Sequence, residues 1–141
     1  MNYTACTLKT TNPIIVLQEN KSRLEIRNAH RIELSQIMVD GCLIDKKLEK
    51  CDWLITYDTP RKTAIYIELK GCDLDKAISQ LKSTLTHTTP HLNQYKKECY
   101  AVTTRVPKHG ATIRKRCLEF HKSTGATLSV KNTPQSIEIG P

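Results

Sequence analysis

The segment AIYIELKG (residues 64–71) restricts the fold of this chain more than any other stretch. Ile and Leu residues alternate in it with Tyr66, Glu68 and Lys70, which is the two-residue period of a β-strand. Most of its residues are β-branched, aromatic or aliphatic, so the pattern predicts an inner strand of a sheet. Glu68 and Lys70 then lie on one face of an otherwise apolar strand, which calls for an explanation.

A second segment, CDWLITY (51–57), has the same character and precedes the first. The residues between them, DTPRK (58–62), favour a turn because Asp and Pro are common turn residues. We therefore expect an antiparallel hairpin. Asp52 opens its first strand, while Glu68 and Lys70 end its second, so the pairing predicts that these three side chains meet at one end of the hairpin.

A helix is predicted directly after this hairpin. From Asp73, a suitable N-cap, apolar residues recur at helical spacing up to Leu85, and Pro90 ends the pattern. The remaining expectations, in chain order, are a loosely held polar segment at 1–12, a strand at 13–18, a loop at 45–50, a polar piece at 91–98, a strand at 99–106, a turn at 107–110, a helix at 113–123 capped by Thr112 and stopped by Gly125, a strand at 127–132 and a polar tail.

Residues 23–44 give the least distinct pattern. We favour strands around a turn at 28–30, ending at the Asp40–Gly41 pair, and a helix over 19–33 is the alternative. With strands and helices alternating in this way, the predicted fold class is α/β, with a mixed central β-sheet flanked by helices. The length of 141 residues fits a single domain, 1–141.

The charge of the chain indicates a polyanionic partner. The net charge is +8, and the excess is uneven: residues 71–141 hold 11 basic and 5 acidic side chains, against 11 and 9 in residues 1–70. Such a balance is typical of nucleic-acid binding, although solubility alone is an alternative. The basic residues that we expect to contact phosphates are Arg105, Lys108, Arg114, Lys115 and Arg116.

Cysteine spacing and hydropathy indicate the cellular compartment of the protein. The six cysteines are scattered without a C-x-x-C pair, a pattern that favours reduced thiols over disulfides or a zinc site. No apolar run approaches the roughly 20 residues needed to span a membrane, and no signal peptide is visible. We therefore expect a cytoplasmic protein without a membrane partner.

Two carboxylates at the end of the hairpin suggest a metal site. Asp52 and Glu68 offer the oxygen ligands that Mg²⁺ prefers, and a lysine beside such an ion positions a water or stabilises charge growing on phosphorus. The structural alternative is a solvated edge strand with an ordinary Glu-x-Lys pair. Asp40 competes with Asp52 as a ligand, although Asp-Gly is also a common turn.

The sequence CDWLI, followed by ELK with fifteen residues between Asp52 and Glu68, resembles the signature of the PD-(D/E)xK nuclease superfamily, which includes restriction-endonuclease-like and Holliday-junction-resolvase-like cores. The resemblance implies a mixed sheet in the order α-β-β-β-α-β. It also implies that Asp52, Glu68 and the backbone carbonyl of Leu69 bind the metal and that Lys70 takes part in catalysis. It covers residues 51–85 well and the N-terminal third hardly at all.

Three details decide how far the resemblance extends. Many members carry a glutamine on the following helix, and Gln80 matches it, but Thr84 stands where a tyrosine often follows. Cys51 replaces the proline of the motif. The acidic residue often found on a first helix has only two candidates here, Glu25 and Glu33.

The sequence thus predicts an endonuclease that hydrolyses DNA with Mg²⁺, for which Mn²⁺ is the expected substitute. DNA is favoured over RNA because the chain has one Phe and one Trp and therefore little material for a base-stacking platform. With 141 residues there is little room for a separate base-reading domain, so we expect cleavage that follows DNA structure, is nonspecific or is directed by a partner. A homodimer is expected, and the alternatives are an inactive nucleic-acid-binding module or a subunit of a larger complex.

Overall fold

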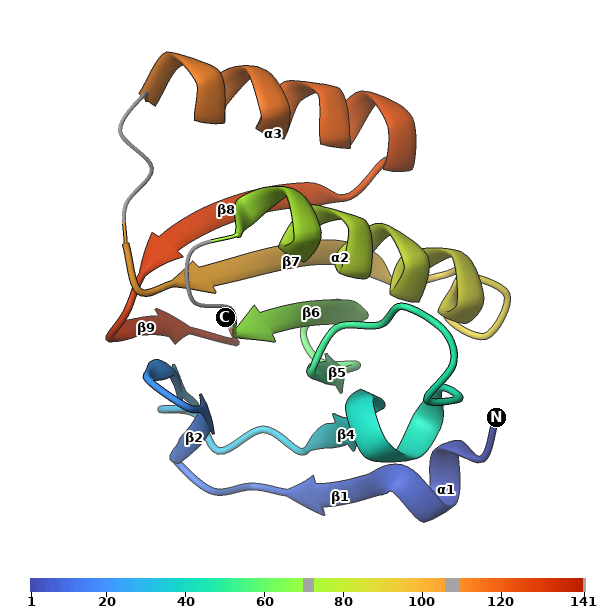
Figure 1. The fold of residues 1–141 in the computed structure, drawn as a ribbon. Helices are drawn as coiled ribbons and strands as arrows, with labels where there is room; N and C mark the ends of the chain where they lie inside the picture. The colour runs from blue at the N-terminus through green and yellow to red at the C-terminus, as the bar shows by residue number, and fades with distance from the viewer. Residues whose placement is uncertain (70–72, 106–109, 141) are drawn as a thin grey trace.

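A computed structural model describes residues 1–69, 73–105 and 110–140 of the chain (Figure 1). A mixed six-stranded sheet forms its centre, with strand order β1-β4-β5-β6-β7-β8. Its first four strands pair antiparallel, and β7 and β8 join parallel to β6. These strands are β1 (Thr7–Thr10), β4 (Leu34–Met38), β5 (Trp53–Tyr57), β6 (Thr63–Leu69), β7 (Lys96–Thr103) and β8 (Thr127–Asn132).

A smaller sheet covers one face of the central sheet. It has the order β2-β3-β9, in which β2 and β3 pair antiparallel and β9 joins parallel to β3. Its strands are β2 (Ile14–Glu19), β3 (Ser22–Arg27) and β9 (Gln135–Glu138). The layer between the two sheets contains buried residues of both, including Leu24 and Ile26 from β3 and Ile65 and Ile67 from β6.

Two long helices, α2 (Leu74–Thr88) and α3 (Gly110–Thr124), cover the opposite face. Leu81 of α2 and Phe120 of α3 belong to one buried cluster with Tyr66 of β6. In Figure 1, α2 lies over β6 and β7, and α3 lies beside β8. Strand β6 is buried at every residue because both faces of the sheet are covered at its centre. This is why its sequence is apolar almost throughout.

The long helices begin and end close to the residues that the sequence indicates. The Asp73 side chain caps α2 by accepting the N–H of Lys76 at 3.0 Å. Gly125 follows α3 with a φ of 77°, a left-handed conformation that favours glycine at a helix end. The expected cap Thr112 is wrong, because α3 already begins at Gly110 and Thr112 lies within its first turn.

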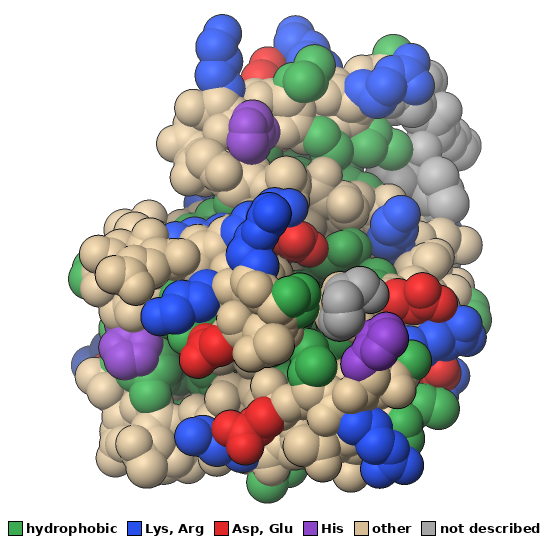
Figure 2. All heavy atoms as spheres, turned by 180° about the vertical axis from the view of Figure 1, so that it is seen from behind, with side chains coloured by type: hydrophobic (Ala, Val, Ile, Leu, Met, Phe, Trp, Pro, Cys, Tyr) green, Lys and Arg blue, Asp and Glu red, His purple; other side chains and the backbone are tan. Residues whose placement is uncertain are grey.

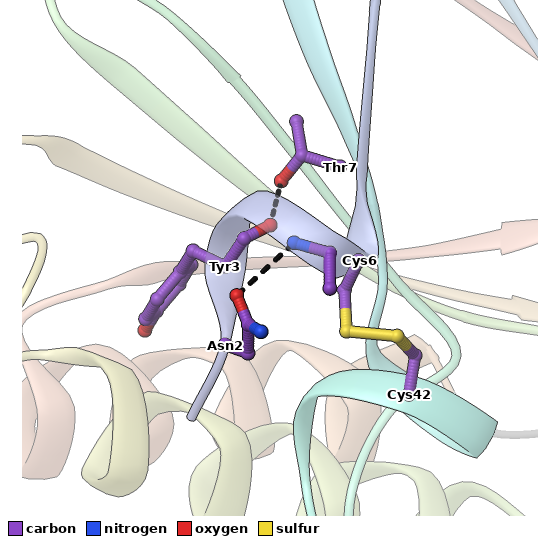
Figure 3. The surroundings of a disulfide bond; sticks show 6 residues. Asn2, Tyr3, Cys6, Thr7 and Cys42 are labelled. Carbon is purple, nitrogen blue, oxygen red and sulfur yellow. Dashed lines mark hydrogen bonds between the residues drawn. A yellow bond between two sulfur atoms is a disulfide. The ribbon is translucent and has the colours of Figure 1, made fainter.

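The N-terminal segment is ordered, contrary to the expectation of a loosely held residue range 1–12. A short helix, α1 (Tyr3–Cys6), leads into β1, which pairs with β4. A disulfide joins Cys6 to Cys42, 36 residues later, in the turn η1 (Val39–Leu43) (Figure 3). The expectation of reduced thiols throughout is therefore wrong for these two residues. The polar sequence of this segment carries no sign of either contact, since both partners are distant in the chain.

Three further predictions meet different outcomes. Residues 23–44 form strands, as we favoured, and the alternative helix over 19–33 is wrong. Strand β7 begins at Lys96, three residues before the predicted start at residue 99, because Lys96 already pairs with Thr63 of β6. The polar C-terminal tail includes strand β9. The mixed central sheet flanked by helices is confirmed, and the second sheet is an addition to it.

Across the residues that the structure describes, no helix is long and apolar enough to cross a membrane. The cytoplasmic location remains a prediction, and the disulfide removes one of the grounds on which it stood.

Candidate active site

Asp52 and Glu68 lie next to each other at one end of the β5–β6 hairpin. The paired register of the two strands ends at Trp53 and Ile67, and beyond it the N–H of Asp52 donates to the Ile67 carbonyl at 3.1 Å. A side-chain hydrogen bond joins the carboxyl groups of Asp52 and Glu68. The sequence predicted that these two side chains meet at the end of the hairpin, and the structure brings them together.

A backbone hydrogen bond fixes the orientation of the Asp52 side chain. Its Oδ2 accepts the N–H of Leu69 at 2.8 Å. Asp52 thus contacts the segment that carries Glu68 twice, through its own N–H and through its carboxylate. Asp52 therefore hydrogen-bonds the start of β5 to the end of β6.

Glu68 faces α2 rather than solvent. Glu68 is only 2% exposed. The amide of Gln80, oriented with its nitrogen toward Glu68, donates to Oε2 at 2.8 Å and to the Lys76 carbonyl at 3.3 Å. Gln80 thus occupies the place beside the second carboxylate that the sequence predicted, and it comes from the helix that directly follows β6.

The charge of Asp52 is unfavourable in this environment. Burial raises the pKa of its carboxyl group above the ordinary value. The hydrogen bond from Leu69 and a side-chain hydrogen bond with Glu68 lower the same pKa in part, while the negative charges of Glu19 and Asp40 raise it further. The ionised form of Asp52 is therefore disfavoured where it lies, and a nearby cation would stabilise it.

Two acidic residues lie near Asp52, and two sequence candidates do not join it. Asp40 belongs to η1, where the N–H groups of Val39 and Asp40 donate to the Asp52 carbonyl at 3.1 and 3.3 Å. Glu19, at the end of β2, is the neighbour that sequence reasoning missed, since no pattern links β2 to the hairpin. The candidates Glu25 and Glu33 form ion pairs with other residues. Arg27 Nε lies 3.2 Å from Glu25 Oε1, and Lys9 Nζ lies 4.0 Å from Glu33 Oε1.

Cys51, directly before Asp52, is not poised as a nucleophile. It is completely buried, and burial raises the pKa of its thiol to about 12. A thiol with this pKa is protonated at neutral pH, so it cannot attack as a thiolate.

The donors at the site suit a hard cation, although they are few. Among the described residues, no three His, Cys, Asp or Glu side chains converge on one point. A Mg²⁺ ion does not need three, because it keeps several waters and binds through one or two carboxylates. Asp52 and Glu68 fit that requirement, with the Leu69 carbonyl between Glu68 and Lys70 as a further oxygen. Lys70 lies outside the described residues.

The predicted phosphate-binding residues are distributed over two elements. Arg114 and Lys115 are exposed on α3, and Arg116 pairs with Asp75 at the start of α2. Arg105 is exposed two residues after β7, and Lys108 lies outside the described residues. Figure 2 shows basic side chains at the upper end of the molecule, where Figure 1 places α3.

A hollow of about 710 Å³ lies over the other end of β5, away from Asp52. It opens on the part of the central sheet that α2 and α3 leave uncovered, and its lining includes Tyr3, Ser35, Thr56 and Tyr95. Ser35 and Thr56 are cross-strand neighbours with small side chains, which leaves the space. The acidic pair is therefore not part of this hollow.

Comparisons with protein-family models, with curated proteins and with solved structures found no match.

Proposed function

We propose that this chain is a metal-dependent endonuclease that hydrolyses DNA at the Asp52–Glu68 pair. The observation that carries this proposal is the cross-strand position of two carboxylates at the end of an inner hairpin, with the amide of Gln80 on the buried one. A structural strand has no need of a buried carboxyl group beside a second, half-buried one, because burial makes the ionised form costly.

The order of the elements supports a restriction-endonuclease-like core. Three antiparallel strands, β4, β5 and β6, are followed by α2 and then by β7, which lies parallel to β6. This is the β-β-β-α-β part of the order that the sequence resemblance implies. The face that a first helix would cover is occupied by the smaller sheet instead.

The residues present would hold Mg²⁺, or Mn²⁺ in its place, through Asp52, Glu68 and the Leu69 carbonyl. Such an ion supplies a water of lowered pKa and stabilises negative charge on the phosphate. The protein residues have separate tasks in this scheme. Leu69 N–H orients the Asp52 carboxylate, Gln80 orients Glu68, and Lys70 positions the attacking water or balances charge on the phosphate.

The basic side chains of α3 and Arg105 are proposed to hold the phosphates of the DNA. Arg114 and Lys115 are exposed, so they are free to approach a backbone, and helix α3 lies on the same side of the central sheet as α2. Their contacts carry no base information, so cleavage would be directed by DNA structure or by a partner. A two-fold dimer would give one site for each strand.

The test is cleavage of supercoiled, linear, single-stranded and four-way-junction DNA by the purified protein, with Mg²⁺ or with EDTA. We expect Mg²⁺-dependent product from wild type and none from Glu68→Gln, which keeps the volume of the side chain and removes its charge. DNA binding that is equal in both conditions, without product from any substrate, would instead identify a non-catalytic binding module.

A further inference from the structure

Three hydroxyl side chains of α2 hold the residues that directly precede Asp52. Ser79 Oγ donates to the Glu49 carboxylate at 2.6 Å, and Ser83 Oγ donates to the Glu49 carbonyl at 2.7 Å. Thr84 Oγ1 accepts the N–H of Cys51 at 2.8 Å. We call Ser79, Ser83 and Thr84 the hydroxyl clamp. Its contacts span 30 to 34 residues of sequence and join a helix to a segment that has no regular secondary structure of its own.

Thr84 is the central member of the clamp. It is fully buried, and its hydroxyl also donates to the Gln80 carbonyl at 2.9 Å. Gln80 in turn donates to Glu68. One helix therefore contacts the strand that carries Glu68 through Gln80, and the segment that leads to Asp52 through Thr84. The distance between the two carboxylates depends on both contacts.

The N–H of Cys51 explains why a hydroxyl is needed at position 84. Cys51 is completely buried, and a buried N–H without an acceptor is costly. Asp52 comes next, with its N–H on Ile67 and its carbonyl on η1. A shift of Cys51 away from α2 would therefore move the backbone of Asp52 relative to Leu69 and Glu68.

We propose that the hydroxyl clamp, and Thr84 above all, is the positioning device of the acidic pair: it sets Asp52 against Glu68 at the spacing that a cation requires. Thr84 touches neither substrate nor cation, so it is a positioning residue and not a catalytic one. The consequence for cation binding rests on the proposed function, whereas the effect on the geometry of Asp52 does not.

Thr88 provides a matched control on the same helix. It is as buried as Thr84, lies one turn later, and donates in the same way to the carbonyl four residues earlier. Its other partner is the Tyr66 hydroxyl at 2.6 Å, in the core and not beside Asp52. Thr84→Val and Thr88→Val thus remove equivalent groups, and Thr84→Ser keeps the hydroxyl.

The experiment compares these variants by NMR and by metal titration. The amide signal of Leu69 reports on its hydrogen bond to the Asp52 carboxylate, and the amide signal of Asp52 reports on its hydrogen bond to the Ile67 carbonyl. We expect both to change in Thr84→Val, to stay at the wild-type values in Thr88→Val and to be restored in Thr84→Ser. The Mg²⁺ concentration at half-saturation should rise about 10-fold or more in Thr84→Val alone, as for other groups that orient metal ligands.

The inference is overturned if Thr84→Val and Thr88→Val give the same Leu69 and Asp52 amide signals. If Thr84→Val does not fold, Ser79→Ala with Ser83→Ala replaces it, since those hydroxyls are only half-buried, and the same comparison decides. Wild-type protein that neither binds Mg²⁺ nor cuts DNA would refute the proposed function, and the NMR comparison would still decide whether the clamp positions Asp52.

Discussion

The Cys6–Cys42 disulfide should make the stability of this protein dependent on redox conditions. It joins the end of α1 to η1. Figure 3 shows two hydrogen bonds within the same segment: the Asn2 side chain caps α1, and the Thr7 hydroxyl donates to the Tyr3 carbonyl. The bridge closes a loop of 36 residues. Chain-entropy reasoning for such a loop gives about 4 kcal/mol of stabilisation.

This free energy can be converted into a melting-temperature shift. At 141 residues the unfolding entropy is about 0.3 kcal/mol/K near the midpoint. Breaking the bridge should therefore lower Tm by roughly 13 °C, which is the ratio of the two values. The effect should also reach the candidate site, because η1 supplies the two N–H groups on the Asp52 carbonyl.

The assay is thermal melting of wild type with and without a phosphine reductant, beside Cys6→Ala combined with Cys42→Ala. Intact mass, 2 Da apart for the two redox states, would verify the bridge before and after reduction. Cys117→Ser is the control, since Cys117 is a free, half-buried thiol. We expect the reduced wild type and the double variant to melt at similar temperatures, and only the wild type to respond to reductant. A verified bridge whose reduction shifts Tm by less than about 3 °C would refute the loop-closure reasoning.

Four further outcomes are expected. Burial raises the pKa of Asp52, so the metal-free fold loses stability as pH rises from about 4 through that raised pKa. Asp52→Asn should therefore have a higher Tm than wild type at pH 8 and the same Tm near pH 3. Equal Tm values at pH 8 would contradict this. Lys70→Ala should still bind Mg²⁺ while cleavage falls about 10²- to 10⁴-fold, and a folded variant that cuts at the wild-type rate would remove Lys70 from the site. Replacing Arg114 and Lys115 by Ala should reduce the salt dependence of DNA affinity, measured by anisotropy, by roughly 0.9 in log–log slope for each lost phosphate contact, while Lys9→Ala, beside the hollow, leaves it unchanged. Light scattering should give twice the chain mass of 16.0 kDa, and a monomer both free and on DNA would exclude the two-fold dimer.

The hairpin shows which parts of the site were predictable. Alternation in 51–57 and 64–70 indicated two strands, and the short turn between them indicated their pairing, which β5 and β6 confirm. Asp52 and Glu68 were predicted to meet at the end of this hairpin, and a side-chain hydrogen bond joins them. The helix after Asp73 followed from its period of apolar residues, whereas Gln80 was marked only by the family resemblance, and the structure places its amide on Glu68.

Thr84 shows the limit of the same reasoning. The sequence marked it only as a departure from the tyrosine of a resembling family. Its helical phase placed it on the buried face, but nothing local indicated that its hydroxyl accepts the N–H of Cys51. That contact depends on how the connection before Asp52 lies against α2, and an irregular connection has no period from which its path could be predicted.

The sequence by itself determined the inner hairpin, the helix after it, the mixed sheet and the meeting of two carboxylates, because each follows from short-range periodicity, turn residues and caps. Only the tertiary structure decided the Cys6–Cys42 bridge, the pairing of β9 with β3, the place of β1 beside β4 and the hold of α2 on residues 49–51. These contacts join segments that are distant along the chain. Their free energy comes from packing and hydrogen bonding in the assembled fold, which local preference does not encode.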